Sequence, residues 1–211
     1  MNNSSEEKIA TQFNVDLWAT DLHRTEIGIF KDEKRRAKER QWSKDSEIIG
    51  EIERDGEKFG PLAIRKAEWE QEDVLKKKLV LKSFTPSAYW RGSMEFLPGK
   101  SIMLSHLSQE PVPAFFINYD GSEYTTRLHK VPHKRDFRGE VWGFDLLLDN
   151  DEIRSFSIDD NRFTLGDHFY IRNVQDEVIG KINGKVINIG GRYEVEIYSQ
   201  DLAETKSFYM T

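Results

Sequence analysis

The clearest pattern of apolar and polar positions lies between Asn161 and Ser199. Short segments in which apolar and polar residues alternate are separated there by residue pairs that tolerate a positive φ angle, as hairpin turns require. The turn pairs are Gly166-Asp167, Asn183-Gly184 and Gly190-Gly191. The segments beside them are Arg162–Leu165, Phe169–Ile171, Val178–Ile182, Lys185–Ile189 and Tyr193–Ile197. Such alternation is typical of strands, so the pattern predicts an antiparallel β-meander of about five strands.

Similar strand signals run through the middle of the chain. Turn signals such as Pro98-Gly99 and Asp120-Gly121 separate short apolar runs there. The expected strands are Leu79–Phe84, Tyr89–Phe96, Ser101–Leu107, Ala114–Tyr119 and Val141–Leu148. They predict one continuous antiparallel β-domain from about Leu79 onward.

Helical signals dominate the N-terminal part. Ser4 and Glu7 have the spacing of a capping box, and Ile9, Phe13 and Leu17 recur every four residues, which predicts a helix over 5–19. This helix either docks on the main domain or binds a partner. The segment 31–45 is charged and almost devoid of apolar residues, which is typical of a solvated helix or a mobile stretch.

A second helix is expected from Pro61 to Lys77, because Pro61 suits a first helical turn and apolar residues follow on one face. Between the two helices, Glu47–Phe59 fits either a helix end or a small hairpin turning at Asp55-Gly56. The predicted class is therefore α+β, mainly β. Residues 1–60 form a charged, mainly helical region, and residues 61–211 form the β-domain, strand-rich from about 79.

The composition supports a globular chain. The mean hydropathy is -0.67, yet 13 Phe, 7 Tyr and 5 Trp supply apolar area for a core. The chain has no Cys, no apolar run long enough to span a bilayer, and no apolar stretch of a secretory signal in residues 1–10. We expect a soluble, cytoplasmic protein that associates peripherally with a membrane.

Charge is distributed unevenly. The net charge of -6 divides into -3 for residues 1–60, +4 for 61–138 and -7 for 139–211. The most basic segment is 127–138, which Pro132 predicts to be a loop or at best an edge strand. The candidate anion-binding residues in and beyond this segment are Arg127, Lys130, Lys134, Arg135 and Arg138, aided by Lys76, Lys77 and Lys78. Such cations suit the phosphates of anionic lipid headgroups, although a solvated loop, a nucleic-acid site and a protein-binding site share this composition.

No metal, cofactor or catalytic signature is present. His129 and His133 would share a face only in a helix, which Pro132 disfavours, and the acidic cluster at 149–152 lacks the ligand spacing of a calcium loop. The sequence contains no nucleophile elbow, P-loop or dinucleotide-binding motif. An enzyme whose site gathers scattered carboxylates such as Asp145, Asp149 and Asp151 stays open.

The meander resembles the LURP-one-related proteins, which belong with the phospholipid scramblases and the Tubby C-terminal domain. The resemblance is carried by Phe163–Ile171, Val178–Val186 and Ile187–Ile197. It implies a closed antiparallel barrel of about twelve strands around a central apolar C-terminal helix, and a non-enzymatic role at membranes, with phosphoinositide binding in the Tubby branch. That helix would begin near Gln200, but only Phe208–Thr211 offer a further apolar stretch. Either the chain stops where its core helix starts, or something else fills the interior.

The leading hypothesis is a non-catalytic module that recognises anionic lipid headgroups through the basic segment. The alternative is a protein-interaction scaffold that uses the N-terminal helix or an exposed sheet edge. The mixed signs of charge in 31–45 argue against a nucleic-acid partner.

Overall fold

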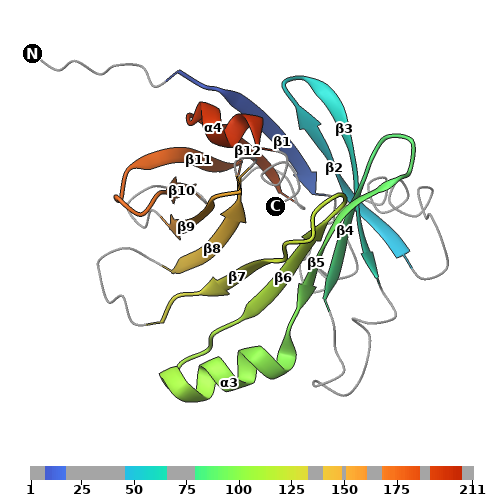
Figure 1. Cartoon of the computed structure of the whole chain (residues 1–211). Coiled ribbons are helices and arrows are strands. Elements are labelled where there is room, and N and C mark those ends of the chain that lie inside the picture. The colour runs from blue at the N-terminus through green and yellow to red at the C-terminus, as the bar shows by residue number, and fades with distance from the viewer. Residues whose placement is uncertain are drawn as a thin grey trace, which may run out of the picture.

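Strands with alternating apolar and polar positions form the whole wall of the molecule. The computed structural model is a closed antiparallel barrel of twelve strands, in which each strand pairs with its neighbours in the chain and β1 pairs with β12 (Figure 1). The structure describes residues 8–17, 46–65, 79–132, 140–148, 151–160, 168–185 and 191–205. Its strands are β1 (Thr11–Leu17), β2 (Ser46–Arg54), β3 (Glu57–Arg65), β4 (Val80–Phe84), β5 (Trp90–Phe96), β6 (Ala114–Tyr119), β7 (Thr126–Lys130), β8 (Val141–Leu147), β9 (Ile153–Asp160), β10 (His168–Arg172), β11 (Val178–Lys185) and β12 (Arg192–Ile197). Two helices are described with them, α3 (Pro98–Ser108) and α4 (Gln200–Glu204).

Residues paired in register point to the same side of the barrel wall, and this places the apolar residues inside. Phe13 on β1 pairs with Val195 on β12, which in turn pairs with Ile182 on β11. On the other side of the barrel, Phe144 pairs with Leu128. All five residues face one interior, so the sequence alternation becomes an apolar lining.

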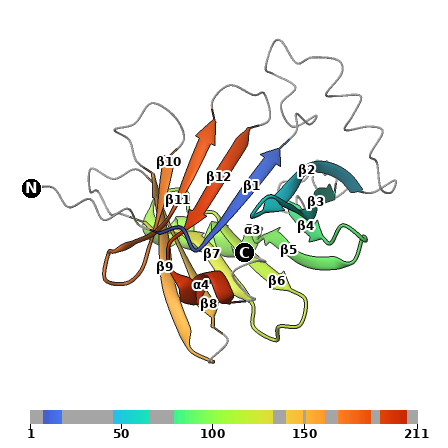
Figure 2. The ribbon, with the colours of Figure 1, turned by 90° about the horizontal axis from the view of Figure 1, so that it is seen from above.

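The short helix α4 closes one end of the core. Its Leu202 is 3% exposed and packs in one cluster with Phe144, Phe156, Ile171 and Ile197. Figure 2 shows α4 and the barrel strands from a second direction, and Arg154 Nη1 of β9 lies 3.6 Å from Asp201 Oδ2 of α4. The helix starts at Gln200, where the resemblance to the LURP-one-related proteins places the start of a core helix.

The two ends of the barrel carry different elements. Because the strands are antiparallel, the pairing of Phe96 with Phe115 and of Lys130 with Trp142 puts the end of β5, the start of β6, the end of β7 and the start of β8 at one end. This end also carries α3, which joins β5 to β6, and we call it the α3 end (Figure 1). The opposite end carries α4 and is called the α4 end.

Several predictions from the sequence are confirmed. Strands lie at β4, β5, β6, β8, β10 and β12 close to the expected bounds, and the chain forms an antiparallel meander. The ambiguous segment 47–59 is a hairpin whose turn has positive φ angles at Asp55 and Gly56. The closed barrel of twelve strands agrees with the fold that the resemblance implies, whereas membership of that family stays a prediction.

The two predicted N-terminal helices are wrong where the structure describes them. Residues Thr11–Leu17 form β1. Residues four positions apart share a face in a strand as well as in a helix, so the spacing fits both. In β1 every second residue, Thr11, Phe13 and Val15, points into the barrel. Residues 61–65 belong to β3, so the division expected at residues 60 and 61 falls inside a barrel strand. The rest of both helices, and the charged segment 31–45, lie outside the described residues.

Two further predictions are wrong. Residues 101–107, expected as a strand, lie in α3, which Pro98 begins at its first position. Asn183 and Gly184, expected as a turn, continue β11, because they pair with Glu194 and Tyr193 of β12 and their backbone groups are satisfied there. The strand expected at 162–165 lies outside the described residues.

We predict that Leu202→Ala lowers the free energy of unfolding by about 2–5 kcal/mol, because it removes a buried side chain from the core cluster. Chemical denaturation monitored by tryptophan fluorescence measures this. The exposed Val174→Ala is the control and should change the stability by no more than about 0.5 kcal/mol. Equal effects of the two substitutions would show that α4 is not part of the core.

Candidate functional site

The helix α3 has its polar and apolar faces reversed relative to an ordinary surface helix. It runs from Pro98 to Ser108 and ends at its C-cap residue Gln109, which has a left-handed φ of 58°. A surface helix normally packs its apolar stripe on the protein and exposes its polar residues. In α3 the serines pack on the barrel, and large apolar side chains face the solvent.

The serine face is attached to the barrel by hydrogen bonds. Ser101 Oγ donates to the Leu97 carbonyl at 2.8 Å and accepts from the Ala114 N–H at 2.9 Å. Ser105 Oγ accepts from the Val112 N–H at 2.8 Å. These contacts satisfy backbone N–H groups of the segment that returns to β6, and they fix the rotation of the helix about its axis.

The apolar face is exposed as a result. Ile102, Met103 and Leu107 are 53%, 45% and 73% exposed. α3 contains no acidic residue, and Lys100 and His106 lie exposed on the same helix. Three large apolar side chains bordered by basic residues form a surface with the composition of an interfacial helix, and we call Lys100, Ile102, Met103 and Leu107 the α3 surface.

A groove of about 580 Å³ lies beside the α3 surface. It is lined by Leu97, Pro98, Gly99, Lys100, Leu104, Ala114, Phe115, Phe116, Arg127, Leu128 and His129. Arg127 and His129 reach it from the outer face of β7, since Leu128 between them lines the interior. The Arg127 guanidinium lies 6.0 Å from the centre of the Phe116 ring. The groove thus combines apolar walls with Lys100 and Arg127.

The structure separates the two candidate cations that it describes. Arg127 is exposed on the outer face of β7. Lys130, three residues on, lies on the other face, and its Nζ donates to Glu140 Oε1 at 2.9 Å. Residues 127–130 are therefore part of a strand paired on both sides, which corrects the expected loop or edge strand. Lys130 is partly neutralised by Glu140, and of the two only Arg127 lines the groove.

Six other candidate cations lie outside the described residues. They are Lys76, Lys77, Lys78, Lys134, Arg135 and Arg138. The strand ends that bracket them are described, and these ends all belong to the α3 end: Ile64 of β3 pairs with Leu81 of β4, and Lys130 of β7 pairs with Trp142 of β8.

Two of the three scattered carboxylates, Asp145 and Asp151, belong to the described residues. Asp145 accepts a hydrogen bond of 2.6 Å from Ser155 Oγ, and Asp151 lies in a turn with a φ angle of 61°. Asp149 lies outside the described residues. Within the described parts of the chain, no three His, Asp or Glu side chains are grouped so that they could hold a metal ion.

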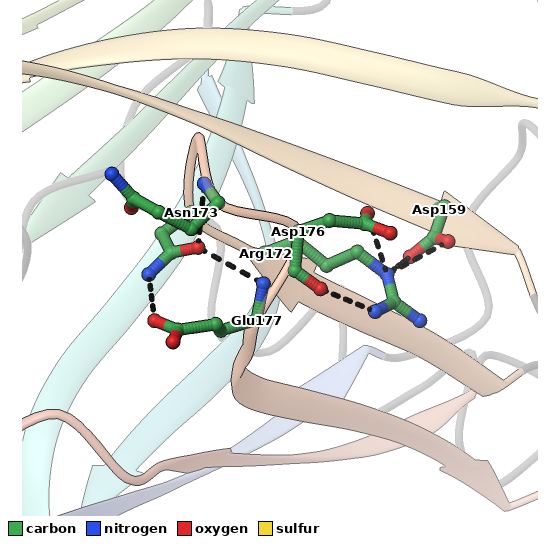
Figure 3. Close-up of polar contacts among 6 residues, drawn as sticks. Asp159, Arg172, Asn173, Asp176 and Glu177 are labelled. Atoms are coloured by element: carbon green, nitrogen blue, oxygen red, sulfur yellow. Dashed lines mark hydrogen bonds and ion pairs between the residues drawn. The ribbon is translucent and has the colours of Figure 1, made fainter.

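A second polar cluster joins Asp159 of β9 to the turn between β10 and β11 and has its hydrogen bonds satisfied internally (Figure 3). Arg172 Nε donates to both oxygens of Asp159 at 3.1 Å, and Arg172 Nη1 donates to the Asp176 carbonyl. Asn173 Oδ1 accepts from the N–H groups of Gln175 and Glu177. These bonds shape the turn between β10 and β11, so we interpret the cluster as structural.

The α3 surface was missed by the sequence analysis. The run Ile102–Leu104 was interpreted as part of a strand, although Pro98 is a helix-start signal and Ser101, Ser105 and Ser108 recur at helical spacing. Those two signals together would have identified the helix. They would not have shown which face points to the solvent.

Comparison of the chain with protein-family models, with curated proteins and with solved structures gives no match in any of the three. Among the residues that the structure describes, neither helix has the length and apolar content that crossing a membrane requires. Proposals about function therefore rest on the contacts of this chain itself.

We predict that Ser101→Ala lowers the free energy of unfolding by about 1–3 kcal/mol, because the buried Ala114 N–H loses its acceptor. Thermal unfolding followed by circular dichroism measures this. The matched control is Lys100→Ala on the exposed side of the same turn, which should change the stability by no more than about 0.5 kcal/mol. A stability of Ser101→Ala equal to that of the parent chain would refute the anchoring role of the serine.

Proposed function

We propose that this protein is a non-catalytic module that attaches peripherally to anionic membranes through the α3 end of its barrel. The observation that carries the proposal is the reversed face of α3, which directs Ile102, Met103 and Leu107 to the solvent next to Lys100 and Arg127. The proposed function is the one expected from the sequence. The proposed membrane contact, however, is the helix α3 and not the basic segment 127–138.

The energetics suit reversible attachment. Burying apolar side chains at a lipid interface gains about 25 cal/mol per Å² removed from water. A basic residue near an anionic surface adds about 1 kcal/mol. Three apolar side chains and two cations therefore supply two separate contributions, of which only the electrostatic one fades as salt increases.

The charge of the rest of the barrel favours the same orientation. Exposed acidic residues gather at the α4 end. They include Asp151, Glu152, Asp176, Glu177, Asp201 and Glu204. Arg154 forms ion pairs with two of them, Glu152 and Asp201. An acidic α4 end is repelled by an anionic surface, so the α3 end turns toward it.

The scaffold alternative loses the surfaces first expected for it. In the described barrel every strand is paired on both sides, so no exposed sheet edge is left for a partner strand. Residues 11–17 are a strand of the same barrel and not a helix. The α3 surface also suits a partner protein, and salt dependence separates the two functions because an apolar protein interface persists at high ionic strength.

The first test of this function removes the apolar side chains of α3. We expect Ile102→Ser, Met103→Ser and Leu107→Ser together to abolish most sedimentation with vesicles that contain phosphoinositide or phosphatidylserine, because no apolar group is left to insert. The control replaces Ile153 and Val174 by Ser, two equally exposed apolar residues at the α4 end, and should bind like the parent chain.

Two outcomes would contradict the membrane proposal. The parent chain could fail to sediment with anionic vesicles at low salt, or the triple variant could sediment as well as the parent. Equal binding to neutral and anionic vesicles would show that the protein does not prefer anionic headgroups.

The second test neutralises the two described cations. Lys100→Gln with Arg127→Gln should weaken binding to anionic vesicles roughly 30-fold at low salt, if each cation contributes about 1 kcal/mol. The variant should also lose part of the salt dependence of the parent. Lys58→Gln with Arg154→Gln at the α4 end is the control.

A separate variant reverses the charge of Lys130, Lys134, Arg135 and Arg138 by substitution with Glu. A further loss of binding would assign these cations to the same surface. Unaltered binding would leave Lys100 and Arg127 as the headgroup contacts.

A further inference from the structure

The groove beside α3 lies between that helix and strands β6 and β7. The helix contributes Leu104 and its first residues, 98–100, and the strands contribute residues 114–116 and 127–129. Leu104 and Phe116 are half-buried, so part of their apolar surface is in contact with water. The volume of about 580 Å³ lies within the range of ~300–1,000 Å³ that is usual for small-molecule sites. The groove can therefore hold a ligand of that size.

The charged residues that line the groove are basic. They are Lys100 and Arg127, both exposed, and no Asp or Glu is among the described residues of the lining. Within the described structure, Arg127 lies over the Phe116 ring and forms no ion pair. His129 lines the groove from the same face of β7 and adds a polar ring. These groups favour an anion beside an apolar wall.

Two carboxylates outside the lining limit the charge of that anion. Phe116 pairs with Glu95 of β5 on one side and with Arg127 on the other. In the antiparallel register of β7 with β8, Asp145 comes opposite Arg127. Glu95 and Asp145 thus flank Phe116 and Arg127 on the same face of the sheet. Because their repulsion increases with the charge of the ligand, a carboxylate with one charge is favoured over a phosphate monoester with nearly two.

We propose that the groove binds one fatty acid, with its carboxylate on Arg127 and Lys100 and its alkyl chain against Leu104 and Phe116. A planar guanidinium matches a carboxylate through two parallel hydrogen bonds. A single alkyl chain fits a site of this volume, whereas a two-chain phospholipid exceeds it. The inference rests on the proposed function, because the α3 surface beside the groove brings it to the membrane in which fatty acids dissolve.

Isothermal titration calorimetry with decanoate, below its micelle concentration and without vesicles, tests this inference. We expect one decanoate per chain. Decanol has the same chain length and no charge, and it should bind about tenfold more weakly because it makes no charge-assisted hydrogen bond. Arg127→Gln should weaken decanoate binding about tenfold and leave decanol binding unchanged, and Arg127→Lys should restore part of the loss.

Two leucines of α3 give a matched pair of variants. Leu104→Ser removes apolar surface from the groove and should weaken the binding of decanoate and decanol alike. Leu107→Ser, on the exposed face outside the lining, should leave both unchanged. The variant with Ser at Ile102, Met103 and Leu107, which we expect to lose vesicle binding, should therefore still bind decanoate.

The inference is overturned if decanoate does not bind, if Arg127→Gln binds it as tightly as the parent, or if decyl phosphate binds more tightly than decanoate. A parent chain that sediments with anionic vesicles but does not bind decanoate would refute the fatty-acid site alone. Because Arg127 is exposed, its substitution preserves the fold, and the result at this position is decisive even if Leu104→Ser fails to fold.

Discussion

The pairing of β1 with β12 closes the barrel, and the other features depend on it. Six residue pairs, from Thr11 with Ile197 to Asp16 with Arg192, join strands from the two ends of the described chain. The turn between β2 and β3 supports this seam, because Asp55 accepts hydrogen bonds from Thr11 Oγ1 and the Gln12 N–H. Without the seam, β1 and β12 would become free edges and the apolar interior would be open to water. Closure therefore creates both the apolar interior and the two distinct ends.

The same seam explains which parts of the fold could be predicted from the sequence. The strands β10 and β12 follow from local alternation and turns, so residues 161–199 revealed a meander without knowledge of distant partners. β1 pairs with strands remote in sequence, and no local signal reports those partners. Its spacing of four residues fitted a helix equally well, and only the apolar faces of β2 and β12 select the strand. The pair Asn183-Gly184 shows the opposite case, in which pairing with β12 overrides a strong turn signal.

The candidate site could be predicted only in part, for a related reason. Arg127 was found by its charge and does lie in the groove, whereas its neighbour Lys130 lies on the opposite face and pairs with Glu140. Composition reports how many cations a segment has, but the alternation of a strand decides which of them reach one surface. The α3 surface depends on Ser101 and Ser105, whose hydrogen bonds to the barrel turn the apolar residues outward. A helical wheel alone places that apolar face inward, because burial of apolar residues is the usual outcome.

Strand β7 contributes side chains to both sides of the barrel wall. It presents Arg127 and His129 to the outer groove and Thr126 and Leu128 to the interior, so adjacent residues serve opposite sides of one barrel wall. A shift of register by one residue would exchange these faces, placing a guanidinium in the apolar interior at a large desolvation cost. The register of β7 is thus selected by the apolar lining of the barrel as well as by hydrogen bonding.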